Sequence, residues 1–277
     1  MTNIRFFSKT VPVILEYSGG RRTDELYEKL AEANPDYKIN VLDNASPGNF
    51  SSYITHQNAK NSWVGGGIID CLDLAEAEGA EYLFFVANDI ELINVPNISR
   101  FETLADCDER IVLVGAAITP DTTQARAYPW MVRRSSNCDR VVPHSDFLCC
   151  LIRIPFVRQF GGFPPSKGGW GYDWEFASYA RFQQRSILIA DHAVIRHTSP
   201  EPGDNEEKML EMKAVYTQLY GDYRVLHAWR LSRQISEVTR VFETKSSSGL
   251  SSKCRLAADQ IGTALRLLED QLSSEVP

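Results

Sequence analysis

Two pairs of residues combine types and positions that suit metal or ligand binding. Asp89 follows the apolar run YLFFV, in the order Ala87-Asn88-Asp89, and a carboxylate at such a strand exit can bind a hard cation. Asp43 and Asn44 follow the run YKINVL, and Asp43 can accept hydrogen bonds from a ligand or close an Asx turn. A turn or helix-cap aspartate is the structural alternative at both places, so neither pair defines a site by itself.

Two further groups lie in the second half of the chain. The segment Gly168–Glu175 (GGWGYDWE) sets glycines, which let a backbone approach a ligand, and tryptophans, which can stack on a sugar or base, around a carboxylate. That carboxylate, Asp173, falls at a predicted helix start, where the helix dipole favours its ionised form, and a helix cap among core aromatics is the alternative. His197 follows a short strand, and its neutral imidazole suits a metal or a structural role, whereas His144 and His192 have weaker claims.

Strands that alternate with helices must position these residues. Apolar, β-branched runs predict the strands, and helical periodicity predicts a first helix that Thr23 caps and that ends at Asn34. This is the pattern of an α/β protein with a parallel sheet covered on both faces, whose ligands bind beyond the carboxyl ends of the strands. That rule selects Tyr17, Asp43 and Asp89. The strands are predicted at 11–17, 37–42, 81–87 and 111–118, and the helices at 23–33 and 64–80.

The second half of the chain has a more mixed pattern. A strand is predicted at 147–154, a helix over 173–184, and two short strands at 186–190 and 194–195. Beyond residue 200 we expect helices over 206–220, 223–242 and 256–272, with a flexible linker at about 245–253. The helix over 223–242 is basic and amphipathic, which suits an anionic membrane surface, packing on the rest of the chain, or a second subunit.

Composition excludes several classes of protein. With 277 residues, 43% hydrophobic and 23% charged, the chain is globular with one large or two small domains, so disorder, collagen and coiled coil are excluded for its bulk. A net charge of −7 makes a nucleic-acid partner unfavourable. No signal peptide or membrane-spanning run is visible, and the six cysteines form no CxxC pair, so we expect a reducing, cytoplasmic setting.

Six motifs occur along the chain in a characteristic order. They are an Asp-Asn-x-Ser element at Asp43–Ser46, an Asn- and Gly-rich segment at Asn58–Gly67, a strand end at Ala87–Asp89, a Gly-Gly-Phe element at Gly161–Phe163, a Gly-Trp-Gly-x-Asp element ending at Asp173, and His197 after a final strand. Over roughly residues 10–200 they resemble the GT-A glycosyltransferases, most closely inverting glycosyltransferase family 2. Two positions depart from the family pattern: Ala87 replaces the first Asn or Asp of the metal motif, and Tyr172 replaces the Glu of a Glu-Asp pair.

The resemblance implies a fold and a domain organisation. The fold would be GT-A: α/β and Rossmann-like, with a central, mostly parallel sheet, flanking helices and a helical C-terminal extension. Residues 1–200 would form the glycosyltransferase domain, with a donor-binding half at about 10–118 and an acceptor and catalytic half at about 119–200. Residues 201–277 would form the extension, which lies outside the resemblance.

The resemblance also implies roles for individual residues. Asp173 would be the general base, and Asp89 and His197 would hold Mn²⁺ or Mg²⁺ against the donor's diphosphate. Asp43 would accept a hydrogen bond from the nucleotide base, with uracil preferred. The donor-binding residues would be Tyr17, Asp43, Asn44, Lys60 and Asn88, and the acceptor-binding residues Trp170, Tyr172, Trp174 and Glu175.

These roles predict an enzyme, cytoplasmic or peripheral at the membrane. It would move a sugar from a nucleotide sugar, UDP-linked by preference, to a glycan, lipid-linked or other hydroxyl acceptor with inversion, as in polysaccharide biosynthesis. Ala87 and Tyr172 motivate one alternative, a catalytically silent module that binds nucleotide sugars or glycans. A glycosyltransferase acting on modified DNA is another, against which the acidic charge argues. Association into a homo-oligomer through the C-terminal helices is also open.

Overall fold

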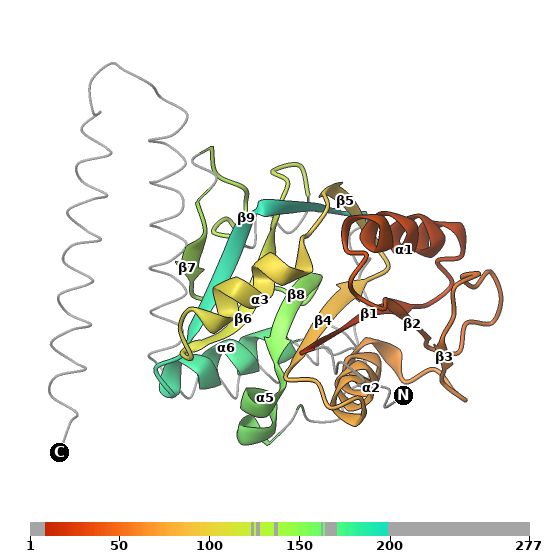
Figure 1. The fold of residues 1–277 in the computed structure, drawn as a ribbon, viewed down its shortest axis with the longest axis horizontal. Helices are drawn as coiled ribbons and strands as arrows, with labels where there is room; N and C mark the ends of the chain where they lie inside the picture. Colours follow the sequence, from red (N-terminus) through yellow and green to blue (C-terminus); the bar gives the residue numbers. More distant parts are fainter. Residues whose placement is uncertain are drawn as a thin grey trace, which may run out of the picture.

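The computed structural model describes residues 9–122, 125, 128–135, 138–161, 163 and 171–198. Trp170, the predicted helices beyond residue 200 and the linker lie outside these residues. Within the described part, no helix combines the length and the apolar character needed to cross a membrane. A nine-stranded sheet forms the centre of the molecule (Figure 1).

The strands and helices have the following bounds. The strands are β1 (Thr10–Glu16), β2 (Asn40–Asp43), β3 (His56–Gln57), β4 (Tyr82–Ala87), β5 (Ile90–Asn94), β6 (Ile111–Ile118), β7 (Arg140–Val142), β8 (Cys149–Arg153) and β9 (Ser186–His197). The helices are α1 (Arg21–Ala33), α2 (Trp63–Ala77), α3 (Ile98–Asp106), α5 (Ile154–Phe160) and α6 (Tyr172–Phe182).

The strand directions bring most carboxyl ends to one edge of the sheet. The order is β3-β2-β1-β4-β8-β6-β9-β5, and β7 pairs with the first part of β9. β1 is parallel to β2 and β4, β8 lies antiparallel between β4 and β6, and β6 is parallel to β9. Only β5, β7 and β8 of the described sheet run the other way. The expected α/β fold with a mostly parallel sheet is confirmed, and we call the edge where β1, β2, β4, β6 and β9 end the carboxyl edge.

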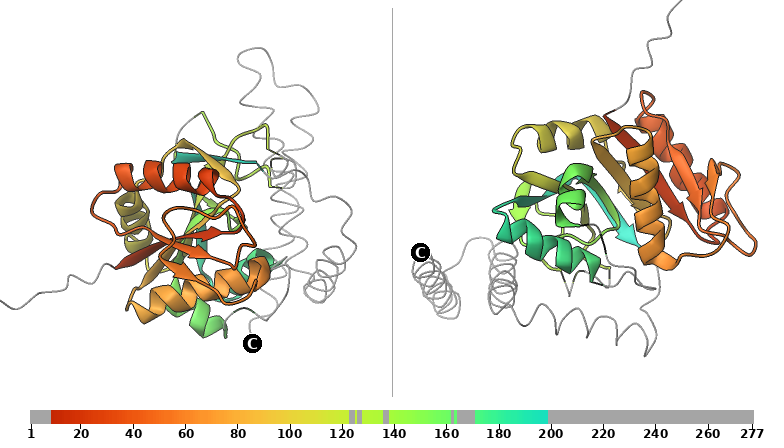
Figure 2. Two further views of the ribbon diagram at one scale, coloured as in Figure 1. Left: turned by 90° about the vertical axis from the view of Figure 1, so that its right-hand side faces the viewer. Right: turned by 90° about the horizontal axis from the view of Figure 1, so that it is seen from below.

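Helices cover both faces of the sheet, with α1 and α3 on one face and α2, α5 and α6 on the other (Figures 1 and 2). Alternating strand residues explain this arrangement. Glu16 of β1 bonds to Thr23 of α1, and Phe84 of β4 packs edge-on against Phe101 of α3. Leu15, one residue before Glu16, points the other way and lies against α2. Because both faces are covered, every residue of β1 and β6 is buried, as in a parallel sheet between two helical layers.

The expected N-cap of the first helix is wrong. Helix α1 begins at Arg21, and Gly20 precedes it with a φ of 50°, a left-handed value that favours glycine. Thr23 lies inside the first turn, is fully buried, and donates its hydroxyl to Glu16. The sequence pattern did not show this because the acceptor is a strand residue seven positions earlier.

The two short strands expected at 186–190 and 194–195 form one strand, β9. Ala190 pairs with Ala116 and Val194 pairs with Ala117, so residues 191–193 bulge out of the ladder. The polar pair at 191–192 interrupts the apolar run, which is why the sequence pattern breaks there although the strand continues. Asp191 in the bulge is fully buried and forms an ion pair with Arg140 of β7.

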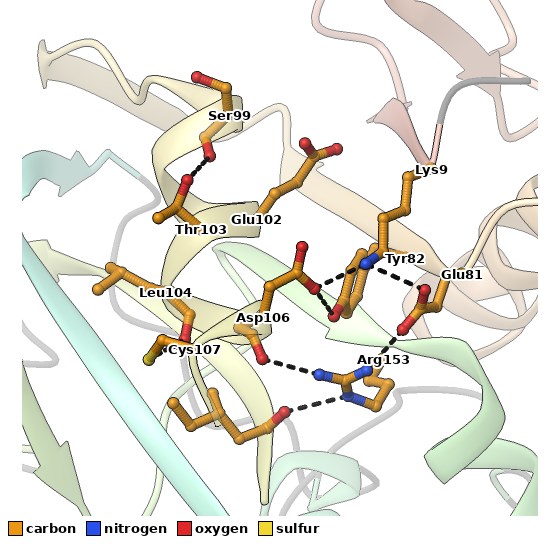
Figure 3. A network of polar contacts seen from close by, with 12 residues as sticks. Lys9, Glu81, Tyr82, Ser99, Glu102, Thr103, Leu104, Asp106, Cys107 and Arg153 are labelled. Carbon is orange, nitrogen blue, oxygen red and sulfur yellow. Dashed lines mark hydrogen bonds and ion pairs between the residues drawn. The ribbon is translucent and has the colours of Figure 1, made fainter. Parts of the chain in front are cut away.

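A network of polar contacts links strands and a helix at the edge of the sheet opposite to the carboxyl edge (Figure 3). Arg153 at the end of β8 pairs with Glu81 at 2.6 Å, and Lys9 pairs with Asp106 at 2.7 Å and Glu81 at 3.2 Å. The Tyr82 hydroxyl donates to Asp106 at 2.7 Å, and the cations of Lys9 and Arg153 lie 5.2 and 4.8 Å from the centre of its ring. The network ties β1, β4 and β8 to α3 away from the strand ends that carry the predicted site.

Candidate active site

Glu16, at the end of β1, organises the first part of the carboxyl edge. Its side chain is fully buried and accepts hydrogen bonds from the backbone N–H groups of Gly19 and Gly20, at 2.7 and 3.1 Å, and from Thr23. Asn88, at the end of β4, donates to the same carboxylate at 2.9 Å. Glu16 therefore holds the turn after β1 against the turn that carries Asn88. Sequence reasoning missed it because a glutamate inside an apolar strand shows no partner in the pattern.

Asp43 is fully buried at the end of β2, and both of its carboxylate oxygens have partners. One oxygen accepts from the backbone N–H and the hydroxyl of Ser46, at 3.1 and 2.5 Å, and the other accepts from the Gln57 amide at 2.8 Å. In this structure Asp43 thus orders the loop that follows β2. Its predicted hydrogen bond to a nucleotide base stays a prediction.

Asn44 links the end of β2 to the start of α2. Its oxygen accepts from the backbone N–H and hydroxyl of Ser62, at 2.9 and 2.8 Å, and from Asn58 at 3.1 Å. Its amide nitrogen donates to the carbonyl of Trp63 at 2.9 Å. Asn44 is 3% exposed, so its side chain holds the first residues of α2 in place at the carboxyl edge.

Strained backbone and exposed side chains mark the rim around these buried groups. Ser18, Ala45, Asn49 and Trp63 have positive φ values of 52°, 56°, 54° and 60°, and such non-glycine residues concentrate at functional sites. They lie in the connections that follow β1 and β2 and lead into α2. The large side chains of Tyr17, Phe50 and Trp63 are 45%, 55% and 53% exposed, and Lys60 is also exposed. An open rim of this kind suits a ligand that covers the strand ends.

Asp89 and His197, the predicted metal ligands, are brought together. The Asp89 Oδ2 and His197 Nε2 atoms are 3.0 Å apart, because β5 turns back immediately after Asp89 and pairs antiparallel with the end of β9. The backbone N–H and hydroxyl of Thr198 both donate to the Asp89 carbonyl at 2.8 Å. Burial lowers the pKa of His197, but its bond to Asp89 and the charges of Asp89 and Asp146 outweigh burial, so the pKa is raised. Among the described residues, no three side chains of metal-ligand type form a cluster.

Asp173, the predicted base, lies in the first turn of α6 and is 8% exposed. Its Oδ2 atom is 2.5 Å from Nε2 of His144, and the His144 ring stacks on Trp174 with ring centres 4.6 Å apart. Burial and the neighbouring Asp173 raise the pKa of Glu175. Tyr172 is 1% exposed and stacks on Phe163, so its side chain packs the core beneath α6.

A further carboxyl group, that of Asp146, is affected by both the Asp89–His197 pair and Asp173. It lies between β7 and β8, and burial, together with the charge of Asp173, raises its pKa to about 7 against the opposing effects of His144 and His197. The charge of Asp89 acts in the same direction as that of Asp173. The segment 144–148 therefore lies beside both the predicted metal ligands and the predicted base, since the Ala87 backbone N–H donates to the Leu148 carbonyl at 2.8 Å and His144 contacts Asp173. The sequence did not single out Asp146 because it follows no clear strand end.

Gly115 of β6 explains how the segment 144–146 approaches the sheet so closely. A Cβ atom on this residue would lie 2.3 Å from the Ser145 hydroxyl oxygen, which is closer than side chains tolerate. A residue larger than glycine would push Ser145 outward, and with it the neighbouring His144 and Asp146.

Comparison with known proteins gives matches in structure but none in sequence. No protein-family model matches the chain, and neither does any curated protein. Among solved structures, GalNAc-T7 with UDP, GalNAc and Mn²⁺ aligns at a TM-score of 0.55 and 12% identity, over 97% of this chain and 58% of the other. Staphylococcus aureus TarS in complex with UDP-GlcNAc aligns at 0.54 and 17% identity, over 93% and 81%. The mannosyltransferase PcManGT from Pyrobaculum calidifontis with GDP-Man and Mn²⁺ aligns at 0.52 and 12% identity, over 96% and 79%.

These similarities show that the chain has the GT-A fold, as the order of its motifs predicted. The chain spans less than two thirds of GalNAc-T7. At such identities the likeness extends to the fold alone, so the assignment to family 2 stays a prediction.

Proposed function

We propose that the chain is a glycosyltransferase that moves a sugar from a nucleoside diphosphate sugar to a hydroxyl group of a glycan or lipid-linked acceptor, with inversion. One observation supports this most. On a GT-A fold, the Asp89–His197 pair follows the end of β4, and the segment 144–148, whose His144 contacts Asp173, bonds to the same strand end through Leu148.

The donor would lie across the ends of β1, β2 and β4. The similar structures hold UDP, UDP-GlcNAc or GDP-Man, so both uridine and guanosine donors are candidates, and we favour uridine. Because both oxygens of Asp43 already have partners, a base that bonds to Asp43 must replace or share the contact from Ser46 or Gln57. Tyr17 and Lys60, on the exposed rim, would contact the nucleotide and its phosphates.

Asp89 and His197 fit a divalent cation. A carboxylate oxygen and an imidazole nitrogen 3.0 Å apart, with the aspartate side chain 30% exposed, are a donor pair that one ion can share. Asp89 and His197 would hold Mn²⁺ or Mg²⁺, and the ion would supply positive charge to stabilise the leaving diphosphate. Two protein ligands suffice, because such ions commonly take their remaining ligands from substrate phosphates and water.

Asp173 would remove the acceptor's proton. The acceptor oxygen then attacks the anomeric carbon from the face opposite to the diphosphate, which inverts that centre, and the Asp173 carboxylate holds the proton. The charges of Asp173, Asp89, His144 and His197 all act on the buried Asp146 carboxyl group, so the reacting atoms would lie among these five ionisable groups. Trp174, beside the base, offers a face for the acceptor sugar.

A thermal-shift panel of UDP-, GDP- and dTDP-sugars, each with and without Mn²⁺, tests the donor site, because a ligand that binds only the folded state raises the melting temperature. We expect a metal-dependent shift with one nucleotide class and its loss in Asp89→Asn. Asp108→Asn, at the amino end of β6 and far from the carboxyl edge, is the matched control and should keep the shift. A shift that EDTA leaves unchanged would exclude the metal role.

Transfer itself is tested with the donor that binds and a panel of glycan and lipid-linked acceptors. We expect Asp173→Asn to lower kcat by about 10²–10⁴-fold while the donor still binds, since a general base acts on the chemical step. Full turnover in Asp173→Asn would contradict the base assignment. Donor binding without any transfer or donor hydrolysis in the wild type would favour the silent binding module that Ala87 and Tyr172 motivate.

A further inference from the structure

His144 is held rigidly against the proposed base. It lies between β7 and β8, is 2% exposed, and its Nε2 atom is 2.5 Å from Oδ2 of Asp173. Its ring stacks on Trp174 at 27° between the ring planes, and the Tyr128 ring centre lies 4.8 Å away. Trp130 fixes the backbone of the same residue, because its indole N–H donates to the His144 carbonyl at 2.7 Å. Ring and backbone are thus both fixed.

The second ring nitrogen of His144 determines which nitrogen carries the proton. Nδ1 is buried and has no hydrogen-bond partner among the described residues. A proton on Nδ1 would leave a buried N–H group unsatisfied, whereas a proton on Nε2 is donated directly to the Asp173 carboxylate. The neutral ring with its proton on Nε2 therefore satisfies Nε2 and leaves Nδ1 as an acceptor without a donor, rather than as a buried N–H group without an acceptor.

We propose that His144 is a positioning residue that orients Asp173 for proton transfer from the acceptor. This inference rests on the proposed function. Nε2–H of His144 occupies Oδ2, and no hydrogen bond within the described part of the chain uses Oδ1, while the side chain keeps 11% exposure. The carboxylate is thus held with Oδ2 occupied and Oδ1 left to receive the acceptor's proton.

The proposed step is balanced with the His144 proton in place throughout. The acceptor hydroxyl passes its proton to Oδ1 of Asp173 while its oxygen forms a bond to the anomeric carbon. The bond from that carbon to the diphosphate oxygen breaks, and its electron pair leaves with the nucleoside diphosphate. His144 neither gains nor loses a proton in this step, so its contribution is to hold Asp173 in position.

Three variants separate this role from simple packing. His144→Phe keeps a ring that can stack on Trp174 but removes the N–H donor, and His144→Gln restores an amide N–H near the Nε2 position. Tyr37→Phe is the matched control, because it likewise keeps a ring and removes a hydrogen-bond donor, here to Glu102, but lies between α1 and β2, at the opposite end of the strands. We expect His144→Phe to lower kcat by about 10–100-fold with the donor KM within twofold. His144→Gln should recover a large part of that loss, and Tyr37→Phe should keep the wild-type kcat.

Nuclear magnetic resonance of the ¹⁵N-histidine-labelled protein tests the same pair without substrate. At pH 8, where an ordinary histidine is neutral, the nitrogen shifts should show the proton of His144 on Nε2, and Asp173→Asn should move that signal. A proton on Nδ1, or a kcat in His144→Phe within twofold of wild type, would overturn the role of His144. A loss in His144→Gln as large as that in His144→Phe would also overturn it, because the restored N–H would then have no effect, and a larger loss in His144→Gln would favour ring packing. Absence of any transfer by the wild type would overturn the proposed function instead, and the nitrogen shifts would still decide the hydrogen bond.

Discussion

Replacing Glu16 with glutamine removes the charge of a buried carboxylate while keeping its size and one acceptor oxygen. In the wild type the carboxylate accepts four hydrogen bonds, from Gly19, Gly20, Thr23 and Asn88. In Glu16→Gln the remaining oxygen can still accept from the two glycines. The new NH₂ group faces the hydroxyl of Thr23 and the amide of Asn88, which are both donors in the wild type.

The hydrogen bonds of Glu16 determine how much the free energy of unfolding should fall in Glu16→Gln. A hydrogen bond to a charged group contributes about 1.5–3 kcal/mol and a neutral one about 0.5–1.5, so the two glycine bonds weaken by about 1 kcal/mol each. The Thr23 hydroxyl can rotate to accept, but Asn88 must turn its amide and lose its bond to Glu16. Glutamine is easier to bury than a carboxylate, which offsets part of the loss. We expect a net loss of about 2 kcal/mol, or about 4–8 °C in Tm for a folded unit of this size.

Urea denaturation followed by circular dichroism measures this loss. We expect the midpoint to fall with an unchanged m-value, since the same surface is exposed on unfolding. Glu25→Gln is the matched control, because Glu25 is 55% exposed and forms only a surface pair with Arg21, so its loss should be below about 0.5 kcal/mol. If Glu16→Gln costs no more than Glu25→Gln, the view that Glu16 holds the carboxyl edge together is wrong.

Two further predictions concern ion pairs away from the strand ends. Arg153→Ala removes one of the two cations that pair with Glu81 and should lower the unfolding free energy by about 2 kcal/mol, measured by urea denaturation, with donor affinity unchanged. A loss below about 0.5 kcal/mol would contradict the importance of the network. Asp191→Ala removes the carboxylate that pairs with the largely buried Arg140, which keeps only neutral partners such as the Trp130 and Val132 carbonyls. The variant should cost about 3–5 kcal/mol by the same measurement, whereas a cost below about 1 kcal/mol would show that the ion pair does not stabilise the bulge.

The parts of the fold that the sequence predicts well are its most buried strands. The strand expected at 111–118 has the observed bounds of β6, and the one expected at 81–87 differs from β4 by one residue. Both are uninterrupted apolar runs, because each is covered on two faces. The residues that follow such strands are equally well placed, since the strand end itself puts Asp43 and Asp89 at the carboxyl edge.

The elements that sequence reasoning missed are short or have no break before them. β5 starts one residue after Asp89, so the turn signal there hides the strand that follows. Helix α5 begins at Ile154, directly after β8 ends at Arg153, and the pattern therefore extends the strand instead of starting a helix. Pro155 near its start is the signal that could have marked it.

The functional side chains that were missed depend on contacts between distant segments. In the sequence, Glu16 is only a polar residue at the end of an apolar strand. Its role depends on the hydrogen bond from Asn88, which lies seventy-two residues later. His144 has a weak claim in the sequence because Asp173, its partner, is twenty-nine residues away on another element. The chemistry of each residue type is readable from the sequence, but its partner is set by the sheet order and by the helix that covers each strand.

The β9 bulge shows that the position of the predicted metal ligands also depends on contacts between distant segments. The first part of β9 runs parallel to β6, and its last residue, His197, lies beside Asp89. The pairing of Ile90 in β5 with His197 fixes this position. The three residues 191–193 lie outside the ladder, so the last part of β9 pairs with β6 three residues out of the register set by the first part. Arg140, from β7, holds the bulge through Asp191. The position of His197 therefore depends on an ion pair six residues earlier along the strand, and bulges that aim side chains near active sites act in this way.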